Sequence, residues 1–99
     1  MSSSKLASRY AAALIDIAND QDLLEQFAGE LNRIGRLFRS PDFSELFRNP
    51  QISIESRRKV LDELLEKISV SPICRNFCRL LNDRRRISLL PEIEEQYRR

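Results

Sequence analysis

Residues 22–39 have the sequence DLLEQFAGELNRIGRLFR, in which apolar residues recur every three or four positions from Leu23 to Phe38. This interval places the apolar side chains on one stripe of a helix of about five turns, with the charged residues opposite. A half-buried strand would need strict alternation of apolar and polar residues, which no segment shows between turn signals. Such a helix must bury its stripe against other elements.

The rest of the chain repeats this helical spacing between clear start signals. Serine residues precede the apolar stripes, and proline stands in the first turn at Pro41 and Pro72. The expected N-caps are Ser3 or Ser4, Ser40, Ser53 and Ser71. We expect an all-α fold, a compact six-helix bundle with helices at about 5–19, 22–39, 41–49, 54–68, 72–83 and from Pro91 onward.

The composition is that of a folded domain without a strong net charge. The 99 residues are 41% hydrophobic and 32% charged, unlike disordered chains, and a chain of this length forms one core. The 17 basic and 15 acidic residues leave a formal charge of +2, which gives little drive toward nucleic acid or anionic lipid. No apolar run approaches the roughly 18 residues of a membrane span, and the N-terminus has no apolar signal-peptide core. We expect a single soluble domain over residues 1–99, on the cytosolic side of a membrane or in an equivalent compartment, with no membrane insertion.

Residue types that catalysis or metal binding requires are scarce. The sequence has no histidine and no glycine-rich phosphate loop, and its two cysteines, Cys74 and Cys78, lie four residues apart on an expected helix. That spacing suits two small apolar residues of a helix interface better than a disulfide, and a zinc site would need further ligands. We predict reduced cysteines, no metal, no cofactor and no enzyme activity.

Two basic clusters, at residues 57–59 and 84–86, are the local features that would suit nucleic acid. No aromatic residue lies between their cations, and acidic residues such as Glu55 and Asp83 flank them. We therefore expect both clusters on solvated helix faces or at a helix end, where positive charge suits the helix dipole, and no nucleic-acid partner.

Two expected helices carry more apolar surface than one core contact needs. At 100° per residue, the apolar side chains of the first helix cover about 200°, and those of the fifth cover about 160°, against roughly 100° for an ordinary amphipathic helix. Either these are the two most central helices of the bundle, or they share their surface between the core and a partner helix lying in a groove.

Three motifs resemble those of ATP synthase delta subunits, the family that includes the oligomycin-sensitivity-conferring protein. Residues 7–14, ASRYAAAL, resemble the opening helix A-x-x-Y-A-x-A-L of that family. Residues 46–53, LFRNPQIS, resemble its turn L-x-N-P-x-I-S/P, and residues 84–93, RRRISLLPEI, resemble its junction N-G-R-L-x-L-L-P-E-I. The three occur in the family's order and spacing across nearly the whole chain.

The resemblance implies a six-helix domain that holds the N-terminal helix of an alpha subunit on the catalytic head of a rotary ATP synthase. It also implies a C-terminal part, absent from this chain, that binds the b subunits of the peripheral stalk, and a place at the cytoplasmic face of the membrane or its organelle equivalent. By resemblance the alpha-subunit helix lies between the first and fifth helices. The groove residues carried over are Leu6, Tyr10, Ala13, Leu14 and Ile17 on the first helix and Phe77, Leu80 and Leu81 on the fifth.

The sequence departs from the family pattern in one turn and in length. Arg84 and Arg85 stand where the family usually has Asn-Gly, so either Arg85 takes the left-handed conformation that glycine favours, or the fifth helix runs longer. The family's subunit is roughly twice as long, so we expect this chain to be its N-terminal domain. The alternative to the family assignment is another helical interaction module, such as a death-domain-like bundle.

Overall fold

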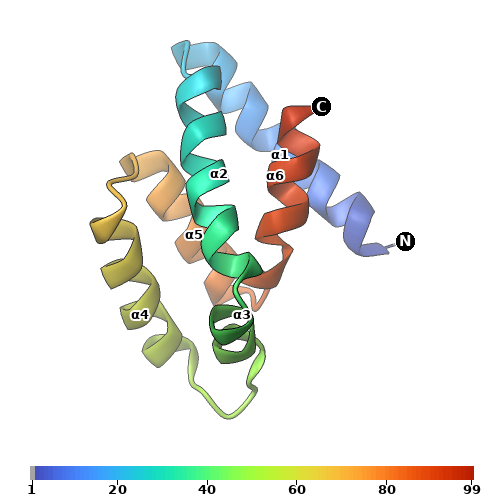
Figure 1. Cartoon of the computed structure of the whole chain (residues 1–99). Coiled ribbons are helices and arrows are strands. Elements are labelled where there is room, and N and C mark those ends of the chain that lie inside the picture. The colour runs from blue at the N-terminus through green and yellow to red at the C-terminus, as the bar shows by residue number, and fades with distance from the viewer. Residues whose placement is uncertain (1) are drawn as a thin grey trace.

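A computed structural model describes the backbone of residues 2–99 and the side chains from Lys5 onward, and these residues are helical with no strand (Figure 1). The N-cap expected at Ser3 or Ser4 is not found, because α1 already begins at Ser2 and both residues lie within the helix. The all-α prediction is confirmed. The helices are α1 (Ser2–Gln21), α2 (Leu24–Arg39), α3 (Pro41–Arg48), α4 (Ile54–Lys67), α5 (Pro72–Asp83) and α6 (Leu90–Arg98), with a short 3-10 turn, η1 (Ile87–Leu89), before α6.

Helix α6 packs against both α1 and α2, and α4 packs against α5. In Figure 1 the last helix therefore lies beside the first, while α4 and α5 form the other side of the molecule. The face of α1 toward the core consists mostly of alanine, since Ala7, Ala11 and Ala18 are at most 2% exposed. Alanine side chains are small enough to let the α6 backbone approach closely. The first helix thus packs mainly against α6, and part of its wide apolar stripe is left uncovered, since Ile17 is 40% exposed.

The predicted starts of the middle helices are confirmed. The Ser53 hydroxyl accepts a hydrogen bond from the Ser56 amide at 3.1 Å, and the Ser71 hydroxyl accepts one from the Cys74 amide at 3.4 Å. Each bond satisfies an amide that the first turn of a helix leaves unpaired. Ser40 occupies the N-cap position of α3 through its backbone alone, because its side chain makes no capping hydrogen bond.

Three helices end at a residue other than glycine in the left-handed conformation, namely Asp22 (φ 58°), Ser69 (φ 54°) and Arg85 (φ 56°). After α5 the Arg86 amide donates to the Leu81 carbonyl at 2.7 Å and the Arg85 amide donates to the Asn82 carbonyl at 2.9 Å, which is the Schellman arrangement. The turn is therefore kept despite the arginine, and α5 does not continue. The same geometry at Asp22 explains why α2 begins at Leu24 and not at the expected residue 22.

The expectation that residues 57–59 form a solvated cluster is wrong for Arg57. This side chain is only 3% exposed, and its guanidinium donates to the carbonyl of Phe47 at 2.8 Å and to that of Asn49. It thereby satisfies carbonyls at the end of α3, where the proline at position 50 stops the helix. Burial, and secondarily the nearby charge of Arg85, lower the pKa of Arg57 from its ordinary value.

The conformation of Arg85 predicts a stabilising substitution. Glycine adopts positive φ without the steric cost of a Cβ, so Arg85→Gly is expected to raise the free energy of unfolding by about 0.5–1 kcal/mol, measured by urea denaturation. Arg85→Ala removes the same charge but keeps the Cβ, and is expected to gain less. Arg84→Gly, at φ −95°, is expected to lose stability. A loss of stability in Arg85→Gly would contradict the left-handed turn.

Candidate partner-binding groove

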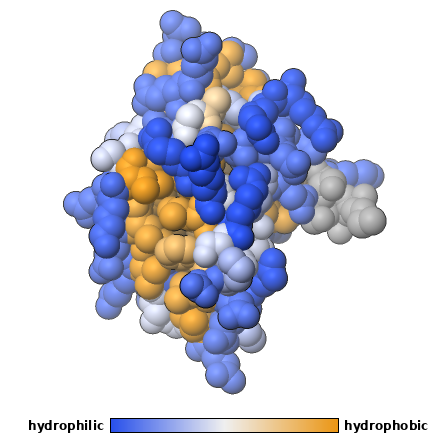
Figure 2. All heavy atoms as spheres, in the orientation of Figure 1, coloured by the Kyte–Doolittle hydropathy of each residue, from blue (hydrophilic) through white to orange (hydrophobic). Residues whose placement is uncertain are grey.

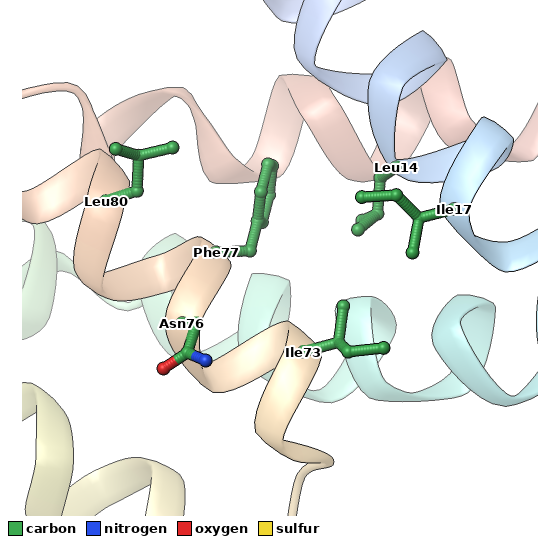
Figure 3. A pocket seen from close by; sticks show the side chains of 6 residues that line it. All are labelled: Leu14, Ile17, Ile73, Asn76, Phe77 and Leu80. Atoms are coloured by element: carbon green, nitrogen blue, oxygen red, sulfur yellow. The ribbon is translucent and has the colours of Figure 1, made fainter.

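Helices α1 and α5 enclose an apolar groove of about 300 Å³ that is open to solvent. Figure 3 shows side chains of α1 facing those of α5 across it, with Leu80 at one end, Phe77 in the middle, and Ile17 and Ile73 at the other end. The two helices run in opposite directions along the groove. The lining residues are Leu14, Ile17, Ile73, Asn76, Phe77 and Leu80.

The groove holds large apolar side chains that are unusually exposed. Ile17 is 40% exposed and Leu80 is 41% exposed, and outside the groove Leu24 alone among the large hydrophobic residues described reaches a similar value, 39%. Exposed apolar area of this kind is unfavourable in water by about 25 cal/mol per Å² relative to burial. A partner that covered the groove would recover this free energy.

A second apolar area lies on the face shown in Figure 2, between the charged outer side of α4 and helices α2 and α3. None of the large hydrophobic residues of α3 and α4 in the described part of the chain is strongly exposed; Phe43, Leu46 and Val60 are partly buried and pack against the core. The groove between α1 and α5 thus holds two strongly exposed large apolar residues, Leu80 at one end and Ile17 at the other.

The residues that sequence analysis assigned to the groove fall into three groups. Leu14, Ile17, Phe77 and Leu80 line it. Tyr10 packs edge-on against Phe77, with ring centroids 6.0 Å apart, while Leu6 is half-buried and Ala13 is exposed on the same helix. Leu81 is fully buried in the core and does not line the groove.

Two lining residues, Ile73 and Asn76, were missed by the sequence analysis. Ile73 precedes Phe77 by four residues, so it shares a helix face with Phe77 and Leu80, and the helical period could have found it. Asn76 is polar and gives no signal in an apolar pattern.

Tyr10 and Arg86 close one end of the groove. An Nη atom of Arg86 donates to the Tyr10 hydroxyl at 2.9 Å, which ties the turn after α5 to α1. Burial alone would raise the pKa of Tyr10, but the guanidinium groups of Arg86 and Arg84 lower it overall. Arg86 directly follows the left-handed Arg85, so the helix-ending turn determines where this guanidinium lies.

A buried carboxylate fixes the other end of α5. Glu30 of α2 is 3% exposed and accepts hydrogen bonds from the Ser71 amide at 2.7 Å, the Ser71 hydroxyl at 2.8 Å and the Gln26 amide group at 2.8 Å. Desolvation alone would raise the pKa of Glu30, but the bonds from Gln26 and Ser71 lower it overall. One side chain therefore anchors the N-cap of the helix that forms a wall of the groove.

The cysteines lie on the inner side of α5, where both are buried and free. Burial, together with the charge of Glu30, raises the pKa of Cys74 to about 12, and burial also raises that of Cys78. Both thiols therefore stay protonated near neutral pH and act as packing residues.

The described residues contain no group of three or more His, Cys, Asp or Glu side chains placed to hold a metal ion. Among the same residues, no helix combines the length and apolar character needed to span a membrane. The arrangement presents apolar surface and no clustered reactive groups.

The fold and the groove together define an all-α bundle with an apolar trough between two helices, the form that accepts an amphipathic helix. The chain belongs to the ATP synthase delta (OSCP) subunit family, whose sequence model matches residues 6–99. Membership of this family does not favour the alternative that the chain is another helical interaction module, such as a death-domain-like bundle.

Curated proteins with similar sequences are named ATP synthase subunit delta. The chain is 42% identical over 98 residues to the ATP synthase subunit delta of Geobacter sp. (strain M21), and 37% identical over 100 residues to that of Nitratidesulfovibrio vulgaris (strain DP4). These alignments cover 98% of this chain but 54% and 55% of the two relatives. The chain thus spans about half the length of the curated relatives it matches.

The role of Glu30 predicts a pH-dependent loss of stability. Glu30→Gln replaces one acceptor oxygen by a donor group, so a buried bond to Ser71 or Gln26 is lost, at a cost of about 1–3 kcal/mol at pH 7. The pKa of Glu30 is lower in the folded than in the unfolded chain, where it is roughly 4.3. Ionised Glu30 therefore stabilises the fold above about that pH, and this stabilisation is lost as the pH falls toward the folded pKa. Urea denaturation between pH 7 and pH 3 should therefore show a smaller pH dependence in Glu30→Gln than in the parent.

Glu25→Gln is the matched control, since Glu25 is exposed in the first turn of the same helix. It should shift stability by less than about 0.5 kcal/mol. Equal effects at both positions would show that Glu30 does not hold α5 in place.

Proposed function

We propose that this chain is a non-catalytic stator adaptor of a rotary ATP synthase, and that its groove between α1 and α5 holds the N-terminal helix of an alpha subunit. The bound helix would link the catalytic head to the peripheral stalk. The observation that carries this proposal is the open apolar groove, in which Ile17 and Leu80 are 40% and 41% exposed. Family membership supports the same role.

The shape of the groove suits an amphipathic helix better than an extended peptide. An extended strand needs an unpaired sheet edge for its backbone, and residues 2–99 contain no strand. A helix satisfies its own backbone and needs only apolar contacts spaced along one face, which the groove offers from Ile17 and Ile73 to Leu80. Each aliphatic anchor that becomes fully buried contributes about 1.5–3 kcal/mol.

Ala13 makes close approach of such a helix feasible. It is exposed on α1, one turn from both Tyr10 and Ile17, and its small side chain leaves room for a second backbone. Tyr10, packed against Phe77 and bonded to Arg86, gives this part of the wall a fixed position. A rigid, small-residue wall costs little conformational entropy on binding.

A stator must resist the torque of the rotor without taking part in chemistry. The proposal therefore includes no catalytic residue and no cofactor. In the proposal, residues 1–99 form one helical domain at the N-terminus of the subunit, and a C-terminal part of the subunit binds the b subunits of the peripheral stalk. The subunit is a peripheral part of the membrane-bound complex and, in a bacterium, lies at its cytoplasmic face.

Charges introduced into the groove test this proposal. Ala13→Asp and Leu80→Asp are each expected to weaken binding of a synthetic alpha-subunit N-terminal peptide at least about tenfold, or 1.4 kcal/mol, because the bound helix would desolvate an unpaired carboxylate. Both positions are exposed in the free domain, so helical content and unfolding midpoint should stay nearly unchanged. Fluorescence titration measures the binding, and circular dichroism melts measure the stability.

The chain offers matched controls for both variants. Ala12→Asp places the same charge on an exposed alanine of another face of α1, and Leu24→Asp replaces a leucine that is 39% exposed outside the groove. Both should bind the peptide like the parent. If Ala13→Asp and Leu80→Asp also bind like the parent, the partner helix lies elsewhere.

A further inference from the structure

Two side-chain contacts in series join the turn after α5 to the middle of the groove. An Nη atom of Arg86 donates to the Tyr10 hydroxyl at 2.9 Å, and the Tyr10 ring meets the Phe77 ring edge-on, with centroids 6.0 Å apart and planes at 74°. Phe77 lies in the middle of the groove lining (Figure 3). Arg86 is not itself a lining residue, so it reaches the groove only through the Tyr10 ring.

The backbone from which Arg86 reaches Tyr10 is held on both sides. The Arg86 amide donates to the Leu81 carbonyl at 2.7 Å, and the Arg86 carbonyl accepts from the Leu89 amide at 3.0 Å. The first bond belongs to the turn that ends α5, and the second opens η1. Leu81 and Ile87 on either side are buried in the core. The guanidinium of Arg86 therefore extends from a fixed point.

The rings of Tyr10 and Phe77 are held less firmly by packing. Both side chains contact the core but remain partly exposed. An aromatic side chain on a helix has two common χ1 wells, and contact on one side restricts it less than full burial. A hydrogen bond from an ionised donor is strong and directional, so a turn of Tyr10 away from Phe77 would break the bond to Arg86. Phe77 has no polar group of its own, and its ring leans on that of Tyr10.

We propose that Arg86 is a positioning residue for partner binding, which holds the Tyr10 ring, and through it the Phe77 ring, in the arrangement that forms the groove. The inference rests on the proposed function, in which a partner helix occupies this groove. Arg86 acts through Tyr10 and not by contact with the partner. A groove formed in advance avoids the loss of affinity that arises when only part of the free protein has the binding conformation.

The position of the rings can be tested on the domain without a partner. Burial raises the pKa of the Tyr10 hydroxyl, but the hydrogen bonds and charges of Arg86 and Arg84 lower it overall, whereas burial raises the pKa of Tyr97, the other tyrosine. In a pH titration followed by the NMR signals of the tyrosine Cζ atoms, Arg86→Leu should raise the pKa of Tyr10 and leave that of Tyr97 unchanged. Nuclear Overhauser effects between the rings of Tyr10 and Phe77 should weaken in Arg86→Leu and persist in Arg86→Lys, which keeps a cationic donor. An unchanged Tyr10 pKa or unchanged ring contacts in Arg86→Leu would overturn the inference.

Peptide binding tests whether the position of the rings matters to the partner. If loss of the bond divides each ring between two wells, about a quarter of the molecules keep both rings in place, and the affinity falls about fourfold. Arg86→Leu and Tyr10→Phe should therefore each weaken binding of the synthetic alpha-subunit N-terminal peptide about fourfold in fluorescence titrations, since each removes one side of the same bond. The double variant should bind no more weakly than either single variant.

Arg36→Leu is the matched control, because it removes an exposed cation from the last turn of α2, outside the groove, and should leave the affinity unchanged. Arg86→Lys should recover part of the affinity, and circular dichroism melts show whether each variant is folded. Losses that multiply to about sixteenfold in the double variant would show that Arg86 contacts the peptide directly, and would overturn the inference. Binding like the parent in Arg86→Leu would overturn it as well. A parent domain that does not bind the peptide would contradict the proposed function, while the NMR measurements would still decide whether Arg86 positions the rings.

Discussion

The packing of α6 into the space beside α1 and α2 is the contact on which the other elements depend, because it joins the last helix of the chain to the first two. The approach is close on both sides. On α1 it rests on Ala7, Ala11 and Ala18, and on α2 it rests on Gly35, where an added Cβ would lie 3.7 Å from the Glu94 side chain and 3.3 Å from an Arg39 nitrogen. Glu94 is 1% exposed, and its charge is balanced by Arg39 at 3.1 Å and Arg98 at 2.6 Å. A buried carboxylate without these partners would be strongly unfavourable, so the same contact fixes the register of α6.

Helix α5 packs chiefly against α4, and polar bonds hold both of its ends. At its start Glu30 binds the Ser71 cap, and at its finish Arg86 reaches Tyr10 across the groove. Between the ends, Cys74, Cys78 and Leu81 bury the inner face, while Phe77 and Leu80 remain for the groove. Helix α5 is therefore positioned by polar bonds at two points and by packing on one side. The side of α5 that lines the groove remains accessible to solvent.

Much of this arrangement was predictable from local patterns. The helical period predicted the six helices, and the serine caps gave the starts of α4 and α5, since Ser53 and Ser71 each act on an amide only three residues away. The left-handed residues Asp22 and Arg85 were harder, because the usual signal for that conformation is glycine, and both glycines of the chain stand inside α2.

Partners that are distant in sequence gave no local signal. Arg57 belongs to a basic cluster by sequence, yet its guanidinium binds carbonyls of Phe47 and Asn49. Leu81 and Leu80 are adjacent leucines of one apolar stripe, but one is fully buried and the other is 41% exposed. Which of two neighbours faces the core depends on where the other helices lie, and the period of a single helix does not determine that.

Helix α1 meets α6 and α5 through different side chains, and the two contacts differ in how closely the helices pack. Small side chains on one face let α6 come close, and Ala7, Ala11 and Ala18 are buried there. Beside that buried stripe, Tyr10 and Ile17 meet α5 only through side chains, and the two backbones hardly approach each other. Large residues hold α5 away from α1, and the ring contact between Tyr10 and Phe77 spans only part of the gap. The space that remains between the two helices is the open groove of about 300 Å³, so the size of the side chains decides whether a neighbouring helix packs closely against α1 or leaves an opening.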